Sequence, residues 1–163
     1  MNNLKINELI VNKLNELNLT ISTCESMTGG ALASSLVMSE HASNSFLGSL
    51  VTYSPNSKIK FAKVSEQTIK EFGTISVECA RQMAINTQRS LNSDIAVAVV
   101  GNASKANPME NKPFGLAYVC IVMFDKTYDL KFTTTYDNRQ DVIRQCAAFC
   151  LNQIWQLIKD LKK

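Results

Sequence analysis

Residues 94–100, with the sequence DIAVAVV, form the segment that most constrains the fold of this chain. Successive side chains of a strand point to opposite faces of a sheet, so a run that is apolar at both odd and even positions is buried on both faces. Such a strand needs a packed layer on each side. The segment therefore favours a layered α/β architecture.

Apolar periodicity and turn residues divide the rest of the chain into helices and strands. Helices are predicted over residues 4–17, 31–38, 65–72, 76–91 and 139–161. Strands are predicted over residues 19–24, 46–53 and 94–100, followed by a hairpin of 114–124 and 128–135 about a turn at 125–127. Because helices alternate with strands and a hairpin follows, we expect one domain over residues 1–163, a three-layer α/β/α arrangement with a mixed β-sheet.

Length and charge exclude several classes of protein. The 163 residues are enough to bury a core without disulfides or a metal. The formal net charge is only +3 and the basic residues form no stripe or tail, so we expect no nucleic-acid partner. No apolar run reaches ~20 residues and the first residues do not resemble a signal peptide, so we expect no membrane partner and a cytoplasmic location.

The cysteines and the single histidine argue against a metal site. Five cysteines without a C-x-x-C pair indicate reduced thiols. Cys146 and Cys150 lie four residues apart on one predicted helix, but two thiols do not complete a tetrahedral zinc site. His41 lies in a polar stretch typical of an exposed loop, which also disfavours a Ser-His-Asp triad. We therefore expect neither a metal nor a cofactor.

The segment after the first predicted strand has the strongest features of a site. It reads ESMTGG over residues 25–30 and precedes a predicted helix. Unpaired amides at a helix start favour an anion or an oxyanion, and Ser26 and Thr28 place hydroxyls beside those amides. The same residues also suit a plain connection in which Thr28 caps the helix while Gly29 and Gly30 turn the chain.

Lys58 follows the second predicted strand and a turn at residues 54–57 that also resembles a helix start. Ligand sites of α/β proteins usually lie at such strand ends. A lysine acts as a general base only where burial or nearby cations favour its neutral form, and Tyr53 would orient it or relay the proton. The alternative is a solvated lysine beside a half-buried tyrosine. Since no glycine-rich nucleotide motif occurs, a Ser26–Lys58 pair is the arrangement that remains for covalent chemistry.

Two further segments contain candidate binding residues. Residues 100–104, with Gly101 near their start, lead from the most strand-like run into a polar loop that either merely connects or covers a substrate. Arg139 and Arg144 lie at the start of the last predicted helix. One or both would hold a phosphate through the forked guanidinium donors, although surface arginines are common.

Taken in order, these motifs resemble the C-terminal domain of the CinA family over nearly the whole chain. The matching residues are Glu25-Ser26-x-Thr28-Gly29-Gly30, then Val51-Thr52-Tyr53-Ser54 with Lys58 following, then Lys112-Pro113-x-Gly115, and finally residues 139–145. The family includes stand-alone nicotinamide-mononucleotide deamidases. The resemblance implies hydrolysis of nicotinamide mononucleotide to nicotinic acid mononucleotide and ammonia, a reaction of pyridine-nucleotide metabolism, without a metal or cofactor.

The resemblance also assigns roles to the matching positions. Ser26 would be the nucleophile, Lys58 the base and Tyr53 an assisting residue. Arg139 would bind the substrate, and the amides from Thr28 to Gly30 would hold the developing oxyanion. By the same resemblance we expect a homodimer.

One stretch departs from the family pattern. The family has a hydroxyl residue followed by G-x-A-G-P-x-G-G, whereas residues 100–108 here read VGNASKANP. Val100 replaces the hydroxyl and the later glycines are absent, which removes a polar contact and backbone freedom near a ligand. An alternative function is therefore a nucleotide-binding or interaction module with weakened or no catalysis on the same scaffold.

Overall fold

Five strands form one mixed sheet in the order β2-β1-β3-β4-β5. The computed structural model describes residues 5–105 and 111–163. The strands are β1 (Ile21–Glu25), β2 (Phe46–Val51), β3 (Ile95–Gly101), β4 (Leu116–Met123) and β5 (Lys126–Thr133). β2, β1 and β3 run parallel, whereas β4 pairs antiparallel with β3 and with β5. The sheet is therefore mixed, as predicted.

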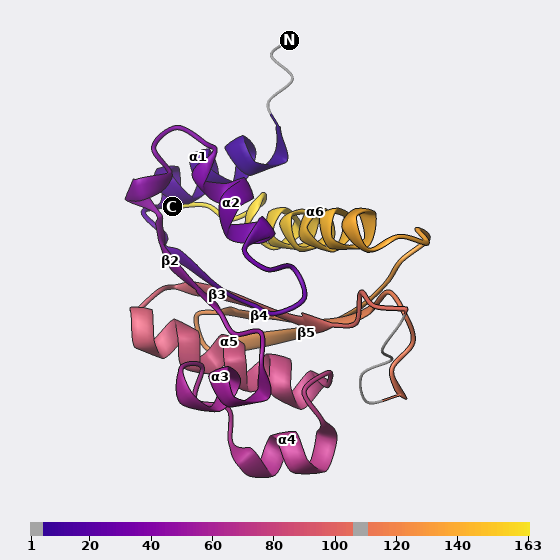
Figure 1. Ribbon diagram of the computed structural model, residues 1–163. Coiled ribbons are helices and arrows are strands. Elements are labelled where there is room, and N and C mark those ends of the chain that lie inside the picture. Colours follow the sequence, from indigo (N-terminus) through magenta and orange to yellow (C-terminus); the bar gives the residue numbers. More distant parts are fainter. Residues whose placement is uncertain (1–4, 106–110) are drawn as a thin grey trace.

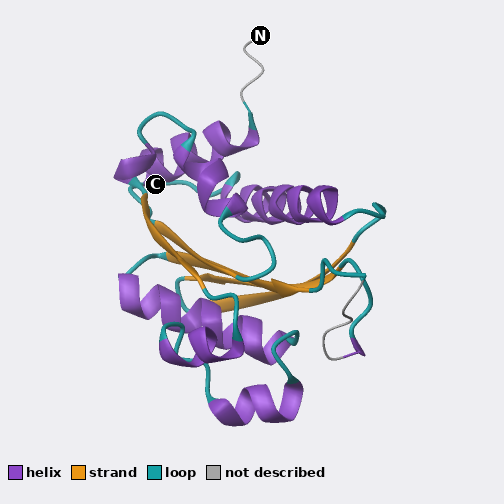
Figure 2. Cartoon of the chain, in the orientation of Figure 1, coloured by secondary structure: helices purple, strands orange, loops and turns teal. Residues whose placement is uncertain are grey.

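Helices cover both faces of this sheet (Figures 1 and 2). On one face lie α1 (Ile6–Leu17), α2 (Ala31–Val37) and α6 (Arg139–Ile158). On the other lie α3 (Pro55–Lys60), α4 (Glu66–Phe72) and α5 (Val77–Leu91). The three-layer prediction is confirmed. Within the described ranges, none of these helices is long and apolar enough to cross a membrane.

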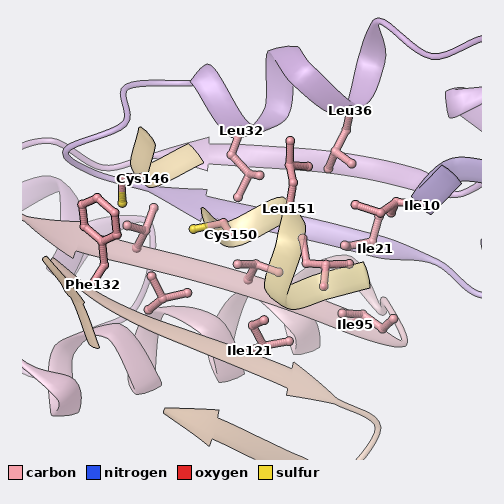
Figure 3. Packing of buried hydrophobic residues seen from close by; sticks show 14 of the residues in the cluster. Ile10, Ile21, Leu32, Leu36, Ile95, Ile121, Phe132, Cys146, Cys150 and Leu151 are labelled. Atoms are coloured by element: carbon pink, nitrogen blue, oxygen red, sulfur yellow. The ribbon is translucent and has the colours of Figure 1, made fainter. Parts of the chain in front are cut away.

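β3 is buried on both faces, and its alternating side chains join two separate clusters. Val97 and Val99 pack into the larger cluster with residues of α1, α2 and α6, part of which Figure 3 shows. Ala98 and Val100 face the opposite layer and pack with residues of α5 such as Met83. The apolar run at residues 94–100 is thus explained by helices on each side of it.

The hairpin turn begins one residue earlier than predicted and is one residue shorter. Met123 pairs with Lys126, so the turn is Phe124–Asp125 and β5 starts where the sequence predicted a turn. Phe124 adopts a φ of 55°, a left-handed conformation that two-residue hairpin turns require and that a sequence with phenylalanine there does not indicate.

Gly115 joins the loop before β4 to the sheet, and its replacement tests how closely the chain packs there. Its φ is +79°, and a Cβ atom at this position would overlap Thr134 Cγ2. Gly29 has a similar φ of +60° but open space around it. Gly29→Ala should lower the free energy of unfolding by about 1–2 kcal/mol, the cost of left-handed backbone. Gly115→Ala should lose a further ~1–3 kcal/mol from overpacking.

Urea denaturation of both variants and the wild type measures these losses. Equal losses for the two variants would contradict the contact between residue 115 and Thr134.

Candidate active site

The segments that follow β1, β2 and β3 meet at one edge of the sheet. Glu25 pairs with Val51 of β2 and with Val99 of β3, so the carboxyl ends of the three parallel strands are level. Open α/β sheets usually bind ligands at this edge. A pocket of about 230 Å³ lies here, lined by Ser26, Met27, Tyr53, Ser54, Pro55, Lys58, Thr74, Ile75, Gly101, Asn102, Ala103, Ser104 and Arg139.

Ser26 and Lys58 contact each other at the bottom of this pocket. Lys58 Nζ lies 2.8 Å from Ser26 Oγ and donates to the Thr52 carbonyl oxygen at 2.6 Å. Only 2% of Lys58 and 8% of Ser26 are exposed. The two residues come from opposite layers of the molecule, since Ser26 leads into α2 and Lys58 belongs to α3. The sequence-based alternative of a solvated lysine is wrong.

The short helix α3 is what directs Lys58 inward. Ser54 caps it by accepting from the Ser57 amide, and Pro55 occupies its first turn. Both features fix where the helix begins. The Lys58 amide then donates to the Ser54 carbonyl, which places the side chain one turn after the cap. From there the four-carbon chain of Lys58 reaches back under the end of β2.

Tyr53 lies at the mouth of the pocket rather than beside the Ser26 hydroxyl. It is 60% exposed, and its hydroxyl accepts a hydrogen bond of 2.7 Å from Arg139 Nη2. Arg139 Nη1 donates to the Ala103 carbonyl at 3.2 Å. Tyr53 and Arg139 therefore connect the segments after β2 and β3 to the start of α6 across the pocket mouth.

The structure does not bring Arg144 to the pocket. Its side chain is 74% exposed and pairs with Asp141 at 3.2 Å on the surface of α6. The expectation that both arginines bind substrate is therefore supported by position for Arg139 alone.

Glu25 binds one of the amides that the sequence assigns to an oxyanion, that of Gly30. Its fully buried carboxylate accepts from the backbone N–H groups of Gly30, Leu32 and Ala33 at 3.0, 3.1 and 2.8 Å. The Gly29 amide donates to the Ser26 carbonyl. The amides of Gly29 and Gly30 are thus engaged within the protein, and the prediction that they hold an oxyanion is not supported.

Two other backbone amides of the same turn have no hydrogen-bond acceptor among the described residues. Neither Met27 N nor Thr28 N has a hydrogen-bond acceptor among residues 5–105 and 111–163. Thr28 does not cap α2, because Gly30 occupies the N-cap position and the buried Thr28 hydroxyl has no hydrogen-bond partner among the described residues. The donors nearest the Ser26 hydroxyl along the chain are therefore those of Met27 and Thr28.

Asn102 organises the loop after β3. Its side chain donates to the Lys112 carbonyl at 2.9 Å and accepts from the Ser104 amide at 2.8 Å. Gly101 is confined by packing, since a Cβ atom there would meet the Leu116 carbonyl at 2.7 Å. The Val100 side chain points into the core and does not line the pocket. Residues 106–108 of the divergent stretch lie outside the described residues.

Thr74 and Ile75 also line the pocket, and sequence reasoning missed them. They form the connection between α4 and α5, next to the Ser76 cap of α5. Nothing in their residue types marks them as part of a site. They reach the pocket only through the path of the connection between α4 and α5.

All five cysteines are free and buried. Burial, followed by the neighbouring Asp129 carboxylate, raises the pKa of the Cys120 thiol to about 12. Burial is also the main cause that raises the pKa of Cys24, and a hydrogen bond with Cys146 together with burial raises that of Cys150. No group of three metal-ligating side chains occurs in the described part of the chain. The cysteines are structural.

A comparison with protein families decides where the chain belongs. Residues 3–158 match the model of the CinA C-terminal domain. The chain belongs to the CinA C-terminal domain family. Protein MG115 of Mycoplasma genitalium is 40% identical over 136 residues, which cover 83% of this chain and 85% of that protein.

Some CinA relatives are much longer. A CinA-like protein of Petrotoga mobilis is 36% identical over 86% of this chain, but the match covers only 34% of that protein. The chain thus spans about a third of this longer relative.

Solved CinA structures share the fold. A CinA superfamily protein from Klebsiella pneumoniae superposes with a TM-score of 0.91 at 20% identity, covering 96% of this chain and 97% of that one. The competence/damage inducible protein CihA from Agrobacterium tumefaciens gives 0.89 at 25% identity, covering 93% of each chain.

The thiols provide a direct test of how the native protein is packed. Because their pKa values are raised, Cys24, Cys120 and Cys150 are protonated at pH 8, and a protonated buried thiol is a poor nucleophile. Dithionitrobenzoate should therefore titrate no thiol rapidly in the native protein at pH 8 and all five in guanidinium chloride. Rapid reaction of one thiol in the native state would contradict the burial described here.

Proposed function

We propose that this CinA-family domain is an amidohydrolase that removes ammonia from nicotinamide mononucleotide, with Ser26 as nucleophile and Lys58 as general base. The observation that carries the proposal is the 2.8 Å contact between Lys58 Nζ and Ser26 Oγ at the bottom of a pocket. A serine hydroxyl is a weak nucleophile unless an adjacent base accepts its proton. Lys58 is the only ionisable side chain among the described residues that contacts this hydroxyl.

The surroundings of Lys58 favour its action as a base. Burial disfavours the charged form of an amine, and 2% exposure leaves Lys58 almost no water. Lys58 Nζ donates to the Thr52 carbonyl and to Ser26 Oγ. In its neutral form the amine would keep the hydrogen bond to Thr52 and use its lone pair to accept the Ser26 proton across the same 2.8 Å. When Ser26 Oγ attacks the carboxamide carbon, its proton passes to Lys58 Nζ.

The oxyanion that forms on the carboxamide needs donors close to Ser26. The Met27 amide is suited to this role, since it has no acceptor among the described residues, directly follows the nucleophile and belongs to a residue that lines the pocket. The Thr28 amide also has no acceptor among the described residues, but Thr28 does not line the pocket. The amide after the nucleophile serves the same purpose in other serine hydrolases. Such pre-arranged donors typically contribute a few kcal/mol of transition-state stabilisation.

The remaining steps conserve atoms and charge. As the tetrahedral intermediate collapses, the C–N bond breaks and the Lys58 ammonium gives its proton to the departing nitrogen, which leaves as ammonia. An acyl ester on Ser26 remains. Water then attacks this ester, Lys58 accepts a proton from the water and returns it to Ser26 Oγ, and nicotinic acid mononucleotide is released.

The phosphate of the substrate suits the cationic mouth of the pocket. Arg139 presents a planar guanidinium there, held by Tyr53 and the Ala103 carbonyl. A bidentate guanidinium is well matched to phosphate oxygens. Met27, Pro55 and Ile75 also line the pocket and supply apolar surface for the pyridine ring. The likeness to mononucleotide deamidases of the family supports the same substrate.

The alternative of a binding module without catalysis was based on the divergent stretch at residues 100–108. Since the Val100 side chain lies in the core, the missing hydroxyl removes no contact from the pocket as described. A pure binding module would be stabilised thermally by the nucleotide without consuming it.

Substitution of the two central residues tests the proposal. The wild type should release ammonia from nicotinamide mononucleotide, and Ser26→Ala or Lys58→Met should reduce kcat at least about 10³-fold, because each removes the nucleophile or its base. Methionine keeps the apolar stem of Lys58, so circular dichroism should show an intact fold. Full activity of Ser26→Ala, or nucleotide-induced stabilisation of the wild type with no turnover, would overturn the assignment.

A pair of arginine variants tests the binding mode. Arg139→Ala should raise KM about tenfold or more with a smaller change in kcat, since a phosphate contact made in both ground and transition states affects binding uniformly. Arg144→Ala is the matched control, because this arginine lies on the same helix but away from the pocket. Equal effects of the two variants on KM would rule out Arg139 as the phosphate contact.

A further inference from the structure

Glu25 stands directly before the nucleophile and is fully buried, yet nothing in the proposed reaction uses it. A buried carboxylate is costly unless its charge is compensated by hydrogen bonds. Glu25 meets this requirement without an ion pair to any residue that the structure describes, since both carboxylate oxygens accept from backbone amides at 2.8–3.1 Å. All three amides belong to the start of α2.

From this arrangement we infer that Glu25 is a positioning residue for the nucleophile. The inference rests on the proposed function of Ser26. α2 has no capping side chain of its own, because its N-cap is Gly30. Glu25 supplies the missing acceptor from the end of β1. Its carboxylate therefore holds the start of α2 against β1, and the turn of residues 26–30 between them is fixed at both ends.

The contacts of neighbouring residues explain how this turn positions the Ser26 hydroxyl. The Glu25 carbonyl accepts from the Thr52 amide, and the Ser26 amide donates to the Val99 carbonyl, so the backbone beside Ser26 is held by β2 and by β3. The Glu25 side chain fixes the chain on the α2 side. Ser26 is left to face Lys58 in the opposite layer at 2.8 Å.

Glu25 also selects which amides are available to the substrate. It uses the Gly30, Leu32 and Ala33 donors, and leaves those of Met27 and Thr28 without an acceptor among the described residues. Without the carboxylate, the amides of Gly30, Leu32 and Ala33 would be free to attract the substrate oxyanion. They lie farther along the chain from Ser26 than the amides of Met27 and Thr28. The carboxylate therefore fixes both the nucleophile and the donors beside it.

The effect on Ser26 is measured with p-nitrophenyl acetate, an activated ester whose burst of p-nitrophenol reports acylation of the serine regardless of the natural substrate. In Glu25→Gln, a carboxamide offers one acceptor oxygen in place of two, and its NH₂ group faces an amide donor. The burst rate constant should fall about 10- to 100-fold, as expected for a nucleophile misplaced by a fraction of an ångström. With nicotinamide mononucleotide, kcat should fall while KM stays unchanged.

Asp94→Asn is the matched control. Asp94 also accepts from a backbone amide before a strand, that of Thr20 at 2.8 Å, but at the amino ends of β1 and β3. Both variants should lower the melting temperature, whereas only Glu25→Gln should slow the burst at a temperature well below melting. Such a difference separates positioning of Ser26 from general stability.

A second variant covers the case in which Glu25→Gln does not fold. Glu25→Asp keeps the charge and loses one methylene, so it should fold, retain KM and show a burst slower than wild type. Wild-type burst kinetics in either folded variant would overturn the positioning role and leave the proposed function intact. Absence of a burst and of ammonia release in the wild type itself would overturn both.

Discussion

The contact between the Lys58 amine and the Ser26 hydroxyl depends on keeping an amine almost free of water. Lys58 is the largest side chain in the fully buried part of the described chain, and its polar end lies between a hydroxyl and the Thr52 carbonyl. An amine in such a place is stable only if these partners satisfy it. The rest of the structure can be understood as the frame that holds the two partners in position.

That frame is the parallel part of the sheet. β1 lies between β2 and β3, and the segments that leave the carboxyl ends of all three strands line one pocket. β1 continues into α2 on one face, and β2 into α3 on the other. A side chain from each layer, Ser26 from one and Lys58 from the other, can then meet at this edge of the sheet. A single helix or loop could not bring two such side chains together.

Much of this arrangement could be predicted from the sequence. The doubly apolar run at residues 94–100 required a layer on each side of β3, and the strand ends before Ser26 and Lys58 placed both residues at one edge of the sheet. Residue type and position made the hydroxyl and the amine candidates, and the resemblance to the CinA family assigned their roles. Their 2.8 Å contact was not accessible from sequence, since a lysine one turn into a short helix is as often solvated as buried.

The predictions for other site residues were wrong or incomplete for reasons that the geometry makes clear. Arg139 and Arg144 are five positions apart on α6, which separates them by about 140° around the helix, so only one can face the pocket. Val100 shares a face with Ala98 by the two-residue period of a strand, and that face is turned to α5. The use of Glu25 as the acceptor for α2 was missed because its partners lie up to eight residues later in the chain. A helix start with no capping side chain, preceded by an acidic residue, was the available signal.

Covalent trapping tests the central claim most directly. The protein is treated with a fluorophosphonate, which phosphonylates activated serine hydroxyls, and the labelled peptide is identified by mass spectrometry. We predict a single adduct on Ser26 in the wild type and loss of that adduct in Lys58→Met, because the buried amine activates the hydroxyl. Labelling of another serine, or labelling of Ser26 at the wild-type rate in Lys58→Met, would contradict the account.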